Sequence, residues 1–348
     1  MKTLSLLTLT LLLALPASLI SQTPFIVGDV ETLPGQKKSG YITVPAGEDC
    51  GEVKVPVTII NGIKEGPVLA LVAGVHGYEY PPILAMTRMA SEIDPGSISG
   101  RVIIVHIANI PSFQKRTVYY GPYDWKNFNR VFPGKIDGNS SERIAWMITR
   151  EVIDKCDYLI DNHCGDGNED LMRYLYCTET GNSEVDARTR ELAINFNLKV
   201  IVRDDGRTKD ISNSMYLSNT ALLRGKPAIS TEVGKLGRTD EDDVLEVMRG
   251  NYNIMKHLGM IDGSPDIRFE SVWVEEYQII TSDHPAGLYF PLVSRGDHVQ
   301  KGELVGYLTD YFGNRLQDVL SPYDGIVLYI IATPPMGQGE PMVMIGRF

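Results

Sequence analysis

The sequence predicts an α/β domain with a mixed, largely parallel central sheet flanked by helices, followed by a smaller all-β domain. Between residues 53 and 258, short apolar runs alternate with segments whose apolar residues recur at helical spacing. This alternation is typical of a parallel sheet covered by helices. Beyond about residue 266, closely spaced glycines separate short apolar runs and no helical period remains. That pattern is typical of a domain built only from strands.

The first residues predict a secretory signal peptide, which we place at residues 1–21. Lys2 precedes an apolar run from Leu4 to Leu15, and Pro16 and small residues follow. This is the layout of a cleaved export signal, and the run is short for a membrane span. An uncleaved anchor is the alternative. We therefore expect a periplasmic or secreted protein without a stable membrane span after cleavage.

Composition restricts the classes of function. The chain carries 33 Lys and Arg against 44 Asp and Glu, a formal net charge of −11. Because no basic surplus exists to neutralise phosphates, we expect no nucleic-acid partner. The four cysteines, Cys50, Cys156, Cys164 and Cys177, show no CxxC spacing, which argues against a structural zinc knuckle. Export permits disulfides, and the sequence leaves all three complete pairings open.

The first half of the α/β domain is organised around the apolar run 68–74, which has the length and composition of a buried strand. The alternating stretch 54–60 predicts a strand before it, and a helix at 82–93 and a strand at 102–107 follow. Residues 108–139 are rich in aromatic and turn residues without a clear period. A long irregular segment inside an alternating domain is usually a functional loop.

The second half continues the alternation. Helical spacing covers 142–155, with Ser140 and Ser141 as candidate N-caps, and also covers 184–196, 214–223 and 240–258. Strands are expected at 158–160, 198–202 and 227–231. In the last part of the chain, 271–281 and 287–293 read as strands. The predicted division is therefore 1–21, 22–265 and 266–348.

Four ionisable residues lie where these predicted strands end. His76 and Glu79 follow the first strand, His163 follows another, and Glu232 ends a third. Ligands bind beyond the carboxyl ends of strands in open parallel sheets. Two histidines and a carboxylate are a ligand set of hydrolytic zinc sites, and a further glutamate can act as general base. His106 also lies in an apolar strand but lacks flanking glycines, so we interpret it as a core residue.

The motifs VAGVHGYEYPP, NFNRVFPG, DNHCGDG and STEVG occur in this order between residues 50 and 260. The set resembles the succinylglutamate desuccinylase/aspartoacylase family, within the zinc carboxypeptidase-like fold. The resemblance implies that His76, Glu79 and His163 bind one Zn²⁺ per chain and that Glu232 is the general base.

The resemblance also implies substrate-binding residues in the irregular segment. Asn129 and Arg130, before the FPG motif, are expected to bind a substrate carboxylate, and a planar guanidinium is suited to that role. Family enzymes use a further arginine to polarise the scissile carbonyl. Arg116 is the nearest candidate, and Lys115 is its competitor. Asp161, two residues before His163, either supports that ligand or makes a hydrogen bond at the edge of the core.

The C-terminal segment has its own resemblance. GDHVQKGELVG and SPYDGIV are similar to the half-repeats of biotinyl and lipoyl carrier domains, which are barrel-sandwich hybrids. The intervening DYFGNRLQD contains no lysine, so a swinging-arm carrier is disfavoured. We interpret this domain as a lid, wall or oligomer contact of the enzyme, and the sequence leaves open whether the chain forms a homo-oligomer.

These observations predict an exported zinc-dependent amide hydrolase that acts on a small acyl-amino acid or a similar carboxylate-bearing amide. A metallocarboxypeptidase or cell-wall peptide amidase is the alternative within the same fold. A non-catalytic binding protein on a hydrolase scaffold is the alternative of another class.

Overall fold

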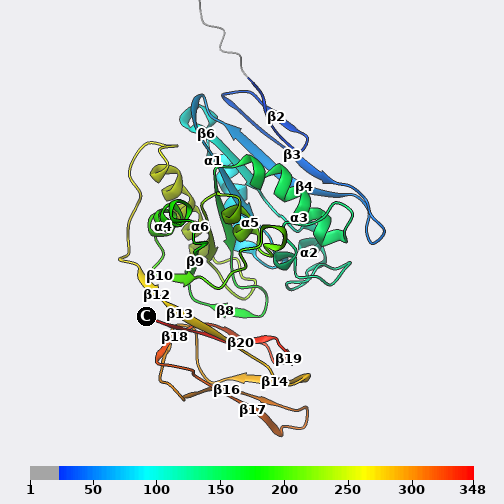
Figure 1. Cartoon of the computed structure of the whole chain (residues 1–348), viewed down its shortest axis with the longest axis vertical. Helices are drawn as coiled ribbons and strands as arrows, with labels where there is room; N and C mark the ends of the chain where they lie inside the picture. Colours follow the sequence, from blue (N-terminus) through cyan, green and yellow to red (C-terminus); the bar gives the residue numbers. More distant parts are fainter. Residues whose placement is uncertain (1–22) are drawn as a thin grey trace, which may run out of the picture.

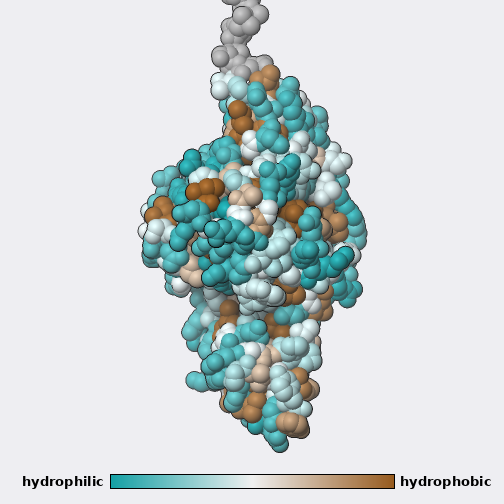
Figure 2. Space-filling view, turned by 90° about the vertical axis from the view of Figure 1, so that its right-hand side faces the viewer, coloured by the Kyte–Doolittle hydropathy of each residue, from teal (hydrophilic) through white to brown (hydrophobic). Residues whose placement is uncertain are grey.

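The computed structural model describes residues 23–348, so the predicted signal peptide lies outside the described part. A large sheet with its helices forms the upper body in Figure 1, and two smaller sheets near the end of the chain lie below it. Within residues 23–348, no helix is long and apolar enough to cross a membrane. The face in Figure 2 is largely hydrophilic, with hydrophobic residues scattered over both parts.

The upper body is built on a nine-stranded mixed sheet. Its order is β12 (Val272–Val274), β10 (Val200–Asp204), β9 (Tyr174–Thr178), β11 (Ala228–Glu232), β7 (Tyr158–His163), β5 (Lys64–Ala73), β6 (Ser99–Val105), β4 (Val53–Asn61) and β3 (Gln36–Val44). The pairings of β9 with β11, β6 with β4 and β4 with β3 are antiparallel, and the other five are parallel. The predicted α/β class with a largely parallel sheet is therefore correct.

Helices cover both faces of this sheet because the strands are apolar on both faces. Leu69 and Leu71 of β5 pack with the helices on one face, α1 (Tyr80–Glu92), α4 (Ser183–Phe196) and α6 (Glu241–His257). Ala70 and Val72 pack on the other face, against α3 (Ser140–Glu151) and α5 (Leu217–Leu223). Successive side chains of a strand point to opposite faces, so one continuous apolar run supplies both cores.

The C-terminal part contains two small sheets. One has the order β13 (Glu276–Thr281), β20 (Pro341–Arg347), β18 (Gly325–Ile331) and β15 (His298–Val299). The other has the order β17 (Arg315–Leu320), β16 (Leu304–Thr309), β14 (Ala286–Pro291) and β19 (Pro335–Gly337). This part contains no helix, as the sequence predicts.

The two parts exchange strands, which the sequence did not reveal. β12, which follows residue 266, pairs with β10 at the edge of the large sheet. In return, β8 (Glu169–Leu171) leaves the upper body and pairs with β18. Tyr174, Val200 and Val202 of the large sheet share an apolar core with Val274 and the C-terminal strands. The core of the lower part therefore extends into the large sheet.

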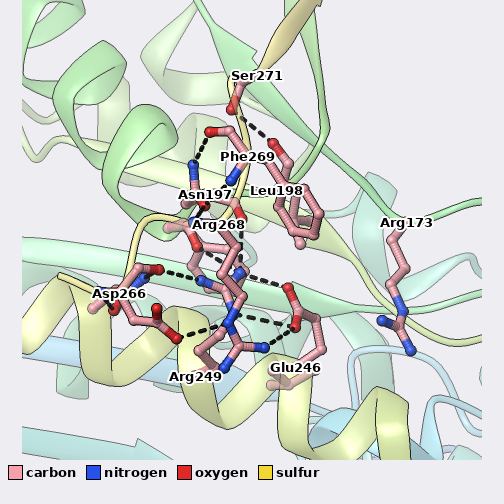
Figure 3. Close-up of polar contacts among 12 residues, drawn as sticks. Arg173, Asn197, Leu198, Glu246, Arg249, Asp266, Arg268, Phe269 and Ser271 are labelled. Atoms are coloured by element: carbon pink, nitrogen blue, oxygen red, sulfur yellow. Dashed lines mark hydrogen bonds and ion pairs between the residues drawn. The ribbon is translucent and has the colours of Figure 1, made fainter.

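Polar side chains form hydrogen bonds with the segment that connects α6 to β12 (Figure 3). Arg249 of α6 donates to the carbonyl oxygens of Asn197, at 2.7 Å, and Asp266, at 3.0 Å. The Asn197 amide bonds both ways with Phe269, through Nδ2 to the carbonyl at 2.8 Å and through Oδ1 from the N–H at 3.1 Å. These bonds hold the connecting segment against the ends of α4 and α6.

The sequence predictions missed several elements. Before residue 53 the chain forms β1 (Phe25–Val27), β2 (Val30–Thr32) and β3, for which no strand was predicted. β8 and β9 were not predicted. Asn139, rather than Ser140 or Ser141, caps α3 through a reciprocal bond pair with Glu142. The irregular segment contains a short helix, α2 (Ile110–Lys115), and a 3₁₀ turn at Phe128–Arg130.

Candidate active site

The candidate site lies at the carboxyl ends of three neighbouring strands, β5, β7 and β11. His163 is the last residue of β7 and is paired in register with Glu232, the last residue of β11. Ala73 at the end of β5 is paired with Asn162. Three segments far apart in the sequence therefore end side by side, as expected for a parallel arrangement.

The HGxE segment follows β5 directly. Gly74 has a φ of +67°, and a Cβ at this position would lie 2.9 Å from the Cα of Ile107, so the turn requires glycine. Glu79 is the N-cap residue of α1, whose first turn contains Pro81 and Pro82. His76 and Glu79 thus lie at the two ends of one short turn, between the strand end and the helix start, and their side chains meet.

Gly77 allows this turn to pack against the irregular segment. A Cβ on Gly77 would lie 2.6 Å from the carbonyl oxygens of both Ser112 and Thr117. Real Cβ atoms do not approach oxygen so closely, so the glycine between His76 and Glu79 has a steric cause.

His76, Glu79 and His163 come together as the sequence predicted. Their candidate ligand atoms all lie within 4.8 Å of one another. The Nδ1 atoms of His76 and His163 lie 2.9 Å and 2.8 Å from the same oxygen, Oε1 of Glu79. All three side chains are largely buried.

The other ring nitrogens face oxygen atoms. His76 Nε2 lies 3.2 Å from Oδ1 of Asn127, and the same oxygen accepts the N–H of Asn129 at 2.9 Å. His163 Nε2 lies 3.0 Å from Oδ2 of Asp161 and 3.4 Å from Nδ2 of Asn129. Asp161 is fully buried, and neither of its oxygens has a well-aligned hydrogen-bond donor within residues 23–348. Its proximity favours a proton on His163 Nε2.

These contacts fit a divalent metal among the three side chains. In the absence of a metal, all four ring nitrogens face oxygen atoms, which requires a proton on each nitrogen. Both histidines would then be imidazolium ions, with ring centroids only 5.5 Å apart. A cation in place of the two Nδ1 protons leaves both rings neutral and keeps the Nε2 contacts, which is the usual environment of a metal-bound histidine. Two imidazoles and one carboxylate are a donor set that zinc prefers.

The electrostatics agree with this interpretation. Burial alone would lower the pKa of His163, but the charges of Asp161 and Glu79 outweigh it and raise that pKa well above its usual range. Burial would also lower the pKa of His76, but the charge of the adjacent Glu79 outweighs burial and raises that pKa. For Glu79, burial is outweighed by the two histidines, which lower its pKa to about 2. The site therefore holds a carboxylate ion and attracts positive charge.

Glu232 lies beside this cluster without belonging to it. It shares the face of the sheet with His163 and lines the same cavity. Burial raises the pKa of Glu232 well above its usual range, against the opposing charge of His163. A carboxylate whose proton affinity is raised in this way is suited to taking and returning a proton.

Asn129 and Arg130 also reach the cavity, although they play different parts. Asn129 is buried, accepts the N–H of Leu217 through Oδ1 at 3.0 Å, and faces His163 through Nδ2. The Arg130 guanidinium lies over the ring of Tyr216, 4.4 Å from its centroid, and pairs with no carboxylate among residues 23–348. Arg130 is therefore available to bind an anion.

Arg116 is not brought to the cavity. It ends α2 in a left-handed conformation, with φ of +54°, and it is exposed. The cavity lining begins one residue later, at Thr117. Lys115 is also exposed and outside the lining. The sequence placed both residues by their distance along the chain from Asn129, and the turn after α2 separates them from the site.

The structure instead adds Arg207, which lies in none of the motifs of the sequence. Its guanidinium lies 3.6 Å from the centroid of Tyr216, the same ring that Arg130 contacts. Arg207 also pairs with Asp204, and it lines the cavity. It lies in the polar stretch RDDGRTKD, where its spacing resembles that of a surface loop. Only the packing on Tyr216 identifies it.

These residues surround one cavity of about 1110 Å³. The upper body contributes the three candidate metal ligands, Glu232 and the two arginines, together with the aromatic segment near Tyr119 and Trp125. The C-terminal part contributes Tyr329, Ile331 and Met336. The C-terminal part therefore forms part of the cavity wall, which agrees with the interpretation of this part as a lid or wall.

Comparison with known proteins identifies the family that the motifs of the sequence resemble. The model of the succinylglutamate desuccinylase/aspartoacylase catalytic domain matches residues 65–258. The chain is 28% identical over 282 residues to the N-alpha-acetyl-L-2,4-diaminobutyric acid deacetylase of Halomonas elongata, covering 78% of this chain and 79% of that protein.

Solved structures share the fold. A succinylglutamate desuccinylase/aspartoacylase from Rhodobacter sphaeroides is 25% identical with a TM-score of 0.78, over 89% of this chain and 95% of that one. The product-bound ectoine utilization protein EutE (DoeB) from Ruegeria pomeroyi is 24% identical with a TM-score of 0.79, over 94% and 98%. Desuccinylases, aspartoacylases and deacetylases all remove acyl groups from amines, which supports amide hydrolysis as the reaction class. The chain belongs to the succinylglutamate desuccinylase/aspartoacylase family.

Proposed function

We propose that this protein is an exported, zinc-dependent deacylase that hydrolyses the amide bond of an N-acyl amino acid. The observation that carries the proposal is the convergence of His76, Glu79 and His163 beside Glu232, in a cavity that also holds two arginines. The relative from Halomonas elongata, an acetyl-amino-acid deacetylase by name, supports the substrate class. Export rests on the layout of residues 1–21.

His76, Glu79 and His163 would hold the zinc ion. When bound, zinc would supply a Lewis acid for the acyl carbonyl and would promote the ionisation of water. Asn127 and Asp161 orient the two imidazole rings through Nε2, so that each Nδ1 stays directed at the cluster. The same oxygens keep the rings from rotating when substrate enters.

Glu232 would move the protons. Its carboxylate accepts a proton from the attacking water and then donates it to the amine nitrogen that leaves. Burial favours the protonated form of Glu232, which makes the first transfer, from water to the carboxylate, easier. Its register partner, His163, fixes its distance from the metal ligands through the hydrogen-bonded strands β7 and β11.

Arg130 and Arg207 would bind the carboxylate of the amino acid. Both guanidinium groups pack on Tyr216, at 4.4 Å and 3.6 Å from its centroid, which limits their movement. An anchored carboxylate fixes the position of the scissile amide relative to Glu232, and such positioning lowers the barrier of the reaction.

A substrate screen tests the proposal directly. Zinc-loaded protein lacking residues 1–21 is incubated with N-acetyl and N-succinyl amino acids and with short peptides, and released amine is measured. We expect turnover of acyl amino acids that stops on chelation and returns with zinc. Release of amino acids from peptides alone would contradict the deacylase assignment and favour a carboxypeptidase.

Substitution of Glu232 tests its role. We expect Glu232→Gln to bind one zinc per chain, as measured by elemental analysis, and to lose at least about 10³-fold in kcat, because general acid–base catalysis contributes roughly 10²–10⁴-fold. Full activity of this variant would remove Glu232 from the mechanism.

Fractionation of producing cells tests export. Retention of the complete chain in the cytoplasm would contradict it.

A further inference from the structure

Arg207 contacts the protein with only one part of its guanidinium group. Its Nε donates to a carboxylate oxygen of Asp204. Neither terminal nitrogen, Nη1 or Nη2, forms a hydrogen bond within residues 23–348, and both keep contact with solvent. The side chain is 14% exposed and lines the cavity. The two free nitrogens are the end of a planar fork that matches the two oxygens of a carboxylate.

Two aromatic rings restrict the plane of this fork. The guanidinium carbon of Arg207 lies 3.6 Å from the centroid of Tyr216 and 5.6 Å from that of Tyr176. Stacking on a ring orients the plane of a guanidinium group. It does not set the direction in which the fork points within that plane. A second contact must set this direction, and the bond from Nε to Asp204 is the one that the structure provides.

Asp204 is itself held from several directions. It is the last residue of β10 and only 2% of it is exposed. Its Oδ2 accepts Arg207 Nε and also the hydroxyl of Thr178, on the neighbouring strand β9, at 3.4 Å. Its Oδ1 accepts the hydroxyl of Tyr277 at 3.1 Å. Asp204 does not line the cavity, so it can act on a substrate only through Arg207.

Tyr277 connects the C-terminal part to this arginine. It lies in β13 and, like Asp204, outside the cavity lining. Burial raises the pKa of Tyr277, and the charge of Asp204 raises it further, so the phenol keeps the proton that it donates. Burial would lower the pKa of Arg207, but the charge of Asp204 is the chief cause that outweighs burial. The group that faces the cavity is therefore a fixed cation.

We propose that Asp204 is a positioning residue, which directs the free nitrogens of Arg207 at the carboxylate of the substrate, and that Tyr277 holds Asp204 in place. The inference rests on the part of the proposed function that assigns carboxylate binding to Arg207. It adds that a side chain of the C-terminal part, outside the cavity, contributes to recognition. The physical reason is that an arginine fixed before binding loses less conformational freedom when it binds.

Two ligands that differ only in the carboxylate test the inference. N-acetylbutylamine is N-acetylnorvaline with a hydrogen atom in place of the α-carboxylate. Both are titrated calorimetrically into the zinc-loaded Glu232→Gln protein without residues 1–21, so the measurement needs no turnover. We expect N-acetylnorvaline to bind this parent protein at least about 10-fold more tightly, because hydrogen bonds between charged groups are stronger than neutral ones.

Removal of the Asp204 carboxylate should affect one ligand alone. In the same parent protein, we expect Asp204→Ala to weaken binding of N-acetylnorvaline about 10-fold and that of N-acetylbutylamine less than about twofold, because a freed arginine must be ordered on binding the carboxylate. Asp204→Asn is the conservative variant. Its amide oxygen can still accept Arg207 Nε, so we expect affinity for N-acetylnorvaline within about threefold of the parent.

Substitution of Tyr277 tests the second step. We expect Tyr277→Phe to weaken binding of N-acetylnorvaline about threefold, because one hydrogen bond to Asp204 is lost. Combined with Asp204→Ala, it should cause no further loss, since Tyr277 acts only through Asp204.

Tyr323→Phe and Asp49→Ala are the matched controls. Tyr323 belongs to the C-terminal part, and its hydroxyl donates to the carbonyl of Ile345 at 3.0 Å. Asp49 pairs with Arg143 at 2.9 Å. Neither residue lines the cavity, so both variants should leave the ratio of the two affinities unchanged within about twofold.

Different results would overturn different parts of the inference. Equal loss of both ligands in Asp204→Ala, without recovery in Asp204→Asn, would reduce Asp204 to a structural residue. Losses that multiply in the double variant would overturn the part assigned to Tyr277. Equal affinity of the parent protein for both ligands would remove Arg207 from carboxylate binding and overturn the whole inference. A substrate screen without any hydrolysis, together with a preserved preference for N-acetylnorvaline, would overturn the proposed function and leave this inference standing.

Discussion

At the scale of single residues, His76 and His163 of the candidate metal site show how metal binding depends on the protonation of the ligands. Each ring directs Nδ1 at Glu79 and Nε2 at an oxygen, and neighbouring carboxylates raise the pKa of both rings. Without a metal, these rings keep their protons above the usual pH of about 6.5 for histidine. Zinc must displace those protons, because a ligating nitrogen carries none.

We therefore predict that zinc affinity falls as the pH is lowered from 8 to 6 and that binding releases protons. The sign follows from the raised pKa, since the protonated rings that compete with zinc become more populated as the pH falls. Calorimetric titration in two buffers of different ionisation enthalpy measures the number released. Identical heats in both buffers at pH 7 would contradict the prediction. His163→Gln is expected to lose stoichiometric zinc altogether.

Gly77 illustrates a motif residue whose role is steric. We predict that Gly77→Ala lowers the free energy of unfolding by about 1–3 kcal/mol, a typical cost of overpacking, and displaces the segment at Ser112 and Thr117. Activity should fall with it, because that segment continues into the cavity wall.

Gly51→Ala is the matched control for this change. A Cβ at Gly51 meets no atom within 4 Å and its φ is not in the left-handed region. Denaturant unfolding of both variants measures the difference. Equal stability of the two would show that the turn at Gly77 adjusts without cost.

At the scale of elements, polar side chains of α6 and of the end of α4 bind the segment between α6 and β12. Arg249 and Glu246 pair on α6 with only 8% of each side chain exposed, and Arg249 also bonds to the carbonyls of Asn197 and Asp266 (Figure 3). Arg268, by contrast, is 54% exposed and pairs with the exposed Asp266.

We predict that Arg249→Met lowers the free energy of unfolding by about 3–5 kcal/mol, because it leaves Glu246 as a buried charge without its partner. Arg268→Met should cost less than about 1 kcal/mol, as is usual for exposed ion pairs. Equilibrium unfolding in urea compares the two. A small effect of Arg249→Met would mean that Arg268, 3.9 Å from Glu246, replaces it.

At the scale of the whole molecule, the exchange of β8 and β12 joins the two parts through shared sheets and a shared core. β8 pairs with β18, β12 pairs with β10, and Val200 packs in the same core as Val274 and Val343. If the two parts folded separately, each would expose apolar residues of this shared core to water. The cavity depends on the same junction, because its lining comes from both parts.

We predict that the protein without residues 1–21 unfolds in a single cooperative transition. In scanning calorimetry the calorimetric and van't Hoff enthalpies should agree, as expected for a two-state transition. A chain that ends at residue 265 should melt at a lower temperature or fail to fold, since it lacks β12 and the partner of β8. Two resolved transitions in the longer chain would show that the parts are independent.

The sequence by itself determined the residues of the candidate site. HGxE after one apolar strand, His163 after another and Glu232 at the end of a third were sufficient, because parallel strands bring their carboxyl ends to one edge of the sheet. The α/β class and the helix-free C-terminal part were likewise determined by the periodicity of apolar residues. These features depend on local patterns and one general rule of topology.

Only the tertiary structure decided what surrounds that centre. It excluded Arg116 from the cavity, brought in Arg207 through Tyr216, and placed Glu169 beside Tyr329 by pairing β8 with β18. Such contacts join residues more than a hundred positions apart, or depend on how a loop turns, and leave no periodic signal in the chain. The sequence therefore identifies the candidate metal ligands and Glu232, while long-range packing decides which further side chains line the cavity around them.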